Sequence, residues 1–105
     1  MIANVMLTDA SHILKNTFDY LIPSELEGKI TSGMRVLVPF GNRNASTEAI
    51  VLDVCETSDF PRLKSIIRLL DEHPICTKEL LNLIFWMQKR YLCSFQQAYK
   101  LVKPP

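Results

Sequence analysis

Two short segments of this chain carry the side chains that are best suited to chemistry. In the first, residues 17–23 (Thr-Phe-Asp-Tyr-Leu-Ile-Pro), one acidic residue, Asp19, stands between two large aromatic residues in an apolar, β-prone sequence. Because aspartate is disfavoured in strands, Asp19 is expected to be solvated, paired or used for binding. An ionised carboxylate only accepts hydrogen bonds, so as a binding group it suits a donor such as a sugar hydroxyl. The pattern leaves open whether Asp19 faces water or a ligand.

The neighbours of Asp19 sort into two sets if this segment is a strand. Side chains alternate between the two faces of a strand, which puts Phe18 and Tyr20 on one face. Asp19 then lies on the opposite face together with Leu21. The sequence therefore predicts an aromatic face and an acidic face within one short strand.

The second segment, residues 35–41 (Arg-Val-Leu-Val-Pro-Phe-Gly), is an apolar strand that stops at a turn. Gly41 either serves a turn with positive φ or lets a flat base approach the backbone closely. Lys64 opens a later apolar segment, where it is either a flanking surface lysine or part of a binding site. The residue pattern keeps both alternatives open for each position.

No set of residues indicates catalysis or a metal site. His12 and His73 each lie in polar, loop-like sequence and are expected at the surface, and no nucleophile–base pair stands out. The cysteines at positions 55, 76 and 93 lack the close pairing that zinc sites require, and an odd, scattered set does not form a disulfide framework. We therefore expect no catalytic residue and no metal ligand, and we expect the cysteines to be buried, reduced thiols.

Length and charge favour one small intracellular domain. The chain has 105 residues, of which 48% are hydrophobic, with 12 basic and 11 acidic residues and a formal net charge of +1. A protein that holds long duplex DNA through many phosphates is usually far more basic, so any contact with nucleic acid should be small and local. The start of the chain has no basic leader, and no apolar run approaches a membrane span of about 20 residues.

The pattern of apolar residues and turns predicts an α+β fold. A small β-barrel-like or strongly twisted sheet of about five strands, within residues 1–71, is followed by two helices within residues 75–102 and a connector at 103–105. Thr77 is the expected N-cap of the first helix and Ser94 begins the second. The predicted strands are residues 2–7, 18–22, 35–40 and 47–55, with a helical turn or loop near 24–28. Residues 63–70 fit a strand or a short helix, and the β-branched pair Ile66-Ile67 favours a strand.

The motifs taken together resemble one known family over nearly the whole chain. They include Phe18-Asp19-Tyr20 with Pro23, Val38-Pro39-Phe40-Gly41, Leu63-Lys64, and Leu70-Asp71 followed by Pro74 and Thr77. Each motif alone is a weak signal, whereas the ordered series is specific. The sequence is similar to the amino-terminal domain of the PriA family of replication-restart helicases.

The resemblance implies a pocket for the 3′ end of a nascent DNA strand, read with little preference among bases. Asp19 would accept a hydrogen bond from the terminal 3′-hydroxyl, and Phe18 and Tyr20 would shape the pocket. Gly41 would give space beside the base, and Lys64 would complete the pocket from a neighbouring segment. The residues expected to lie close to a phosphate are Arg43 and Arg62.

The resemblance also implies partners and a cellular setting. The expected partners are DNA with a free 3′ end, forked DNA, the helicase core of the same polypeptide, other primosome proteins and single-stranded DNA-binding protein, without a membrane. ATP and zinc would bind only the remainder of such a helicase, because its motor motifs are absent from this sequence. The expected location is the bacterial cytoplasm, at the nucleoid. The alternative hypothesis is a protein-interaction or structural β module without a nucleotide pocket. An enzyme has no support in these residues.

Overall fold

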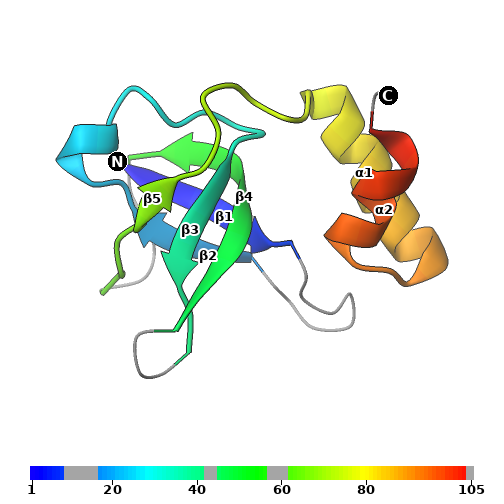
Figure 1. Cartoon of the computed structure of the whole chain (residues 1–105), viewed down its shortest axis with the longest axis horizontal. Helices are drawn as coiled ribbons and strands as arrows, with labels where there is room; N and C mark the ends of the chain where they lie inside the picture. Colours follow the sequence, from blue (N-terminus) through cyan, green and yellow to red (C-terminus); the bar gives the residue numbers. More distant parts are fainter. Residues whose placement is uncertain (9–16, 42–44, 57–61, 104–105) are drawn as a thin grey trace.

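The computed structural model describes residues 1–8, 17–41, 45–56 and 62–103. These residues form one antiparallel sheet and two helices that lie beside one end of it (Figure 1). The order of strands in the sheet is β2-β1-β4-β3-β5. The elements along the chain are β1 (Ile2–Leu7), β2 (Thr17–Leu21), the 3-10 turn η1 (Ser24–Leu26), β3 (Arg35–Pro39), β4 (Ser46–Cys55), β5 (Arg68–Leu69), α1 (Lys78–Tyr91) and α2 (Phe95–Val102).

The sheet curls without closing into a barrel. After residue 62 the chain first runs beside β2, where the Leu21 amide donates to the Lys64 carbonyl at 2.9 Å and the Ile66 amide donates to the Leu21 carbonyl at 3.0 Å. It then crosses to β3, where the Ile67 amide donates to the Leu37 carbonyl at 2.8 Å. Residues 64–67 therefore tie β2 to β3, although β1 and β4 lie between these strands in the sheet.

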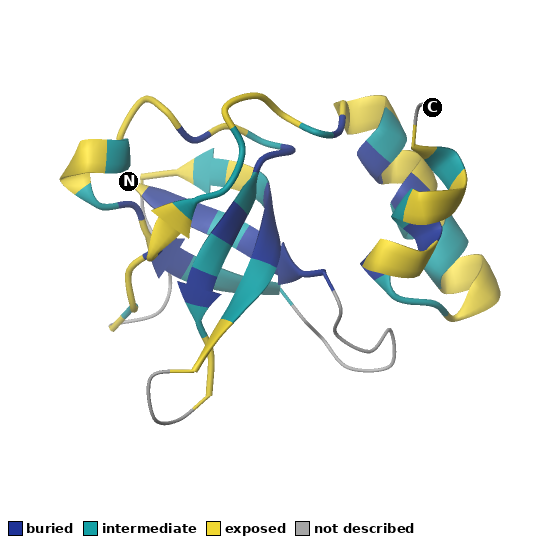
Figure 2. Ribbon diagram, in the orientation of Figure 1, coloured by how far each residue is buried: buried dark blue, intermediate teal, exposed yellow. Residues whose placement is uncertain are grey.

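The two faces of the sheet bury two separate cores. Val5, Val36 and Val51 belong to the first core, which lies inside the curl of the sheet. Met6 and Ile50 point to the other face, where they pack with the helices and with Cys76. Figure 2 shows β1 buried along most of its length, as expected for a central strand with a core on each face. Along β3 buried and partly buried residues alternate, which follows from the two-residue repeat of a strand.

The two predicted helices are confirmed, as is Thr77 as the N-cap of the first. The Thr77 side chain accepts a hydrogen bond from the Leu80 amide, and the Ser94 side chain accepts one from the Gln97 amide. Ser94 and Gln97 form a reciprocal capping box, which satisfies two amides at the start of α2. The helices turn their apolar faces to the second core through Leu81, Ile84, Phe95 and Ala98.

Two sequence expectations are wrong. The strand predicted over residues 63–70 is only two residues long, Arg68–Leu69, with one isolated bridge at Ser65. This segment changes partner from β2 to β3, so it cannot continue in one ladder. Cys55 is exposed rather than buried, because it lies at the end of β4, whereas Cys76 is buried and Cys93 partly buried. Burial raises the pKa of the Cys76 thiol to about 11, which keeps this thiol protonated.

An ion pair fastens the end of the β segment to β3. The Arg35 side chain donates from Nη2 to Oδ1 of Asp71 at 2.8 Å and from Nε to Oδ2 at 3.0 Å, and the Arg35 amide also donates to Oδ2 at 2.9 Å. The hydrogen bonds from Arg35 hold the pKa of Asp71 below its usual range. This contact anchors residues 62–71, which carry Lys64, to the sheet.

We expect Asp71→Asn to lower the free energy of unfolding by about 1.5–3 kcal/mol at neutral pH, since it removes charge-assisted hydrogen bonds. The folded pKa of Asp71 is lower than its unfolded value of about 3.9, so the carboxylate stabilises the fold above that pH and loses its effect as the pH falls further. Thermal unfolding at several pH values should therefore show a difference between wild type and variant that shrinks below about pH 4. Exposed Asp53, changed to Asn, is the matched control. An Asp71→Asn difference that stays constant down to about pH 2.5 would contradict this role.

Candidate functional site

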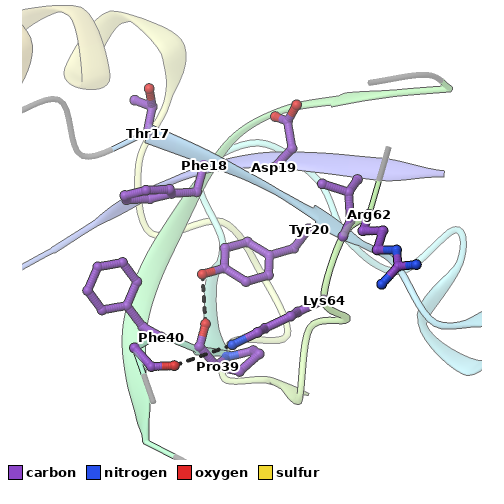
Figure 3. Close-up of a pocket in the computed structure, with 10 residues that line it drawn as sticks. Thr17, Phe18, Asp19, Tyr20, Pro39, Phe40, Arg62 and Lys64 are labelled. Carbon is purple, nitrogen blue, oxygen red and sulfur yellow. Dashed lines mark hydrogen bonds between the residues drawn. The ribbon is translucent and has the colours of Figure 1, made fainter. Parts of the chain in front are cut away.

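A pocket of about 260 Å³ lies where β2, the end of β3 and residues 62–64 meet (Figure 3). This volume is slightly below the range of about 300–1,000 Å³ that is typical of small-molecule sites, so the pocket has room for about one nucleotide unit. The structure brings six of the seven predicted site residues into its wall. The lining residues are Thr17, Phe18, Asp19, Tyr20, Pro39, Phe40, Gly41, Arg62, Leu63 and Lys64.

Tyr20 joins β2 to the end of β3. Its ring is buried, with 5% of the residue exposed, and its hydroxyl donates to the Pro39 carbonyl at 2.7 Å. Burial raises the pKa of Tyr20, so the phenol stays neutral and keeps its proton for this bond. Tyr20 therefore fixes the distance between the two sides of the pocket.

An aromatic pair forms a second wall. The rings of Phe18 and Phe40 meet edge to face, with centroids 5.3 Å apart and an interplanar angle of 64°. Phe18 is half-buried against the first core, whereas Phe40 is 41% exposed. An exposed ring held by a half-buried neighbour offers a π-face to a flat ligand at little cost in ordering.

Gly41 and Lys64 meet at the rim of the pocket. Gly41 has φ of +78°, and a Cβ built on it meets no atom within 4 Å. Glycine is therefore needed here for the turn, and the space beside it stays open. The Lys64 ammonium donates to the Gly41 carbonyl at 3.3 Å, so the cation lies across the mouth of the pocket (Figure 3).

Asp19 lines the pocket, but its carboxylate lies on the other side of β2. In Figure 3 this carboxylate points away from Tyr20 and Lys64. It accepts a hydrogen bond from the Asn4 side-chain amide at 2.9 Å, across the β1–β2 pair. The predicted split between an aromatic face and an acidic face is therefore confirmed.

The two arginines expected near a phosphate differ in outcome. Arg62 lines the pocket and is exposed. Arg43 lies outside the described residues. Four residues that line the pocket were not predicted as site residues: Thr17, Pro39, Phe40 and Leu63. Of these, Phe40 could have been found, because it directly precedes Gly41, a predicted site residue.

The arrangement suits a flat, anionic ligand. Aromatic walls provide stacking surface, and Lys64 and Arg62 supply positive charge at the rim.

In the described ranges, no group of three or more His, Cys, Asp or Glu side chains could hold a metal ion. No helix in the described part of the chain is both long and apolar enough to cross a membrane.

A small antiparallel sheet with a pocket of nucleotide size between β2 and the end of β3 defines a binding module. The model of the PriA 3′DNA-binding domain (3′BD) family matches residues 4–104, and the chain belongs to this family. The expected resemblance is therefore confirmed.

Several replication restart proteins named PriA are similar to this chain. The protein of Bacillus subtilis is 38% identical over 104 residues, which cover 97% of this chain and 13% of that protein. The protein of Haemophilus influenzae is 39% identical over 87 residues, 81% of this chain and 11% of that protein. The Rickettsia conorii protein is 37% identical over 86 residues, 82% of this chain and 13% of its own length. The chain thus spans about an eighth of the relatives it matches.

Proposed function

We propose that this chain binds the 3′-hydroxyl end of a DNA strand, with the terminal nucleotide in the pocket between β2 and β3. The observation that carries the proposal is that five residues from three separate segments line one nucleotide-sized pocket. These residues are Phe18, Asp19, Tyr20, Gly41 and Lys64.

The walls of the pocket support binding without selection among bases. A base can stack on the exposed ring of Phe40, and stacking tolerates any base because every base has a π-face. The open space at Gly41 lets the base approach the backbone. Lys64 and Arg62 can contact the phosphate on the 5′ side of the terminal nucleotide. These few contacts agree with the formal net charge of only +1.

Asp19 is the proposed discriminator between the end and the interior of a strand. Its carboxylate would accept a hydrogen bond from the terminal 3′-hydroxyl in place of the one from Asn4, with the sugar reaching past β2 to the acidic face of this strand. An internal nucleotide has a phosphate in place of the hydroxyl and is repelled. Loss of a charge-assisted hydrogen bond costs about 1.5–3 kcal/mol, which corresponds to at least a tenfold preference for the end.

We expect the chain to bind an oligonucleotide with a 3′-hydroxyl end at least about tenfold more tightly than one with a 3′-phosphate end. Asp19→Ala should remove this preference, because it removes the acceptor and the repulsive charge together. Fluorescence anisotropy with 5′-labelled oligonucleotides measures both affinities. Asp53→Ala, at an exposed aspartate of β4, is the control that should keep the preference. Equal binding of both ends by the wild type would refute the proposal.

The relatives support a role for this module in replication restart. We propose that it positions a replication-restart helicase at forked DNA during primosome assembly. Its partners would be the helicase core of the same polypeptide, other primosome proteins and single-stranded DNA-binding protein, at the nucleoid in the bacterial cytoplasm. In this proposal, the chain itself holds no cofactor, and ATP and zinc act in the helicase core, which unwinds DNA from 3′ to 5′.

A further inference from the structure

A second cleft, of about 360 Å³, lies on the other face of the sheet from the aromatic pocket. It is bounded by the end of β1, by β3 and β4, and by α2, which lies beside the sheet (Figure 1). Its walls hold three cationic side chains and one carboxylate. These lining charges are Arg35, Lys100, Lys103 and Glu48.

The single carboxylate of the cleft is already engaged. Glu48 Oε1 lies 3.7 Å from Arg35 Nη1 and also accepts a long hydrogen bond from the Thr8 hydroxyl at 3.5 Å. Arg35 is in turn held by Asp71. These interactions leave the two lysines as the cations that can respond to a ligand.

Lys100 lies in the last turn of α2 and Lys103 is its C-cap three residues on, and both line the cleft. Within the described residues, neither ammonium group has a carboxylate oxygen within 4.0 Å. Two like charges at this spacing repel each other slightly, although the negative end of the helix dipole offsets part of the cost. An anion bound between the two ammonium groups would remove the remaining repulsion.

The floor beside the lysines is flat and carries neutral donors. The ring of Tyr99 stacks on buried Phe95, with centroids 6.0 Å apart and an interplanar angle of 10°. Burial raises the pKa of the Tyr99 phenol, which therefore keeps its proton as a hydrogen-bond donor. The amide side chain of Gln96 lies in the same wall and can donate as well.

We propose that this cleft is a second DNA-binding site, in which Lys100 and Lys103 bind backbone phosphate and Tyr99 and Gln96 donate further hydrogen bonds. The inference rests on the proposed DNA-binding function. Because the cleft and the aromatic pocket lie on opposite faces of the sheet, the cleft would hold a different part of a branched DNA from the 3′ end. Arg35 positions the wall and does not need to touch the DNA.

The test compares two charge-matched double variants by anisotropy across a salt titration, with a 5′-labelled branched DNA that carries one 3′-hydroxyl end. For each phosphate that it no longer binds, the Lys100→Gln, Lys103→Gln variant should bind DNA about five- to eightfold more weakly at about 0.1 M salt. Its salt slope should fall by about 0.7–0.9 per phosphate. The control, Lys78→Gln with Lys89→Gln, removes two charges from α1 and should change the slope less. Equal effects of the two pairs would overturn the inference.

A third variant separates binding from folding. Gln96→Glu places a carboxylate in the first turn of α2, where the helix dipole favours it, so stability should not fall. The new charge should nevertheless weaken DNA binding several-fold, and unchanged affinity would overturn the inference. The ratio of affinities for 3′-hydroxyl and 3′-phosphate ends should stay at its wild-type value in every cleft variant. If the wild type itself lacks that preference, the pocket proposal fails. The salt slopes of the two double variants still decide whether the cleft binds DNA.

Discussion

Replacing Gly33 by alanine should lower the free energy of unfolding by about 2–5 kcal/mol, a large part of the 5–15 kcal/mol that typically stabilises a domain. Gly33 has φ of +92°, and a Cβ built there would collide with the backbone carbonyl oxygen of Cys76. The carbonyl cannot simply move, because Gly33 also accepts a hydrogen bond from the Ile75 amide at 2.8 Å. The added methyl group therefore separates residues 74–76 from the sheet.

Gly28 offers a matched control for this prediction. It also has positive φ, +78°, but a Cβ built on it meets nothing within 4 Å. Gly28→Ala should therefore cost only the backbone term, about 1–2 kcal/mol. Denaturant titration or thermal unfolding of both variants measures the difference, with about 4–8 °C of Tm for each kcal/mol. If both substitutions cost the same, the close approach at Cys76 has no energetic weight.

Local patterns were enough to predict most of the fold. A capping residue predicted the start of α1, because Thr77 bonds to an amide only three residues ahead. Alternation predicted the opposite faces of Phe18 and Asp19, since that relation is fixed within one strand. These features need no knowledge of the rest of the chain.

The parts that the sequence did not predict depend on long-range pairing. Residues 63–67 are rich in β-forming side chains, but they divide their hydrogen bonds between Leu21 and Leu37 on two strands. The hydrogen bond between Asn4 and Asp19 is set by the register between β1 and β2. The assignment of Phe40 to the pocket depends on the curl of the sheet, which brings this residue to Phe18. No local pattern encodes these distances.

Replacing Phe40 by alanine should produce a large loss of DNA affinity, comparable with that of Asp19→Ala. Base–aromatic stacking is worth about 1–3 kcal/mol per base, which corresponds to a loss of about 5- to 150-fold. The fold should tolerate the change, since Phe40 is 41% exposed and packs against the edge of Phe18. Trp86→Ala is the control, because Trp86 is 56% exposed and lies on α1, away from the pocket.

An abasic 3′-terminal nucleotide turns this prediction into a double-mutant cycle. If Phe40 stacks on the terminal base, removing the base costs the wild type as much as removing the ring, and removing both costs little more. The preference for a 3′-hydroxyl over a 3′-phosphate should survive in Phe40→Ala, since the proposed discriminator is the charge on Asp19 and not the ring. If the loss of affinity from Phe40→Ala and the loss from the abasic nucleotide simply add, the terminal base does not stack on Phe40. The proposed pocket would then act on the sugar and phosphate alone.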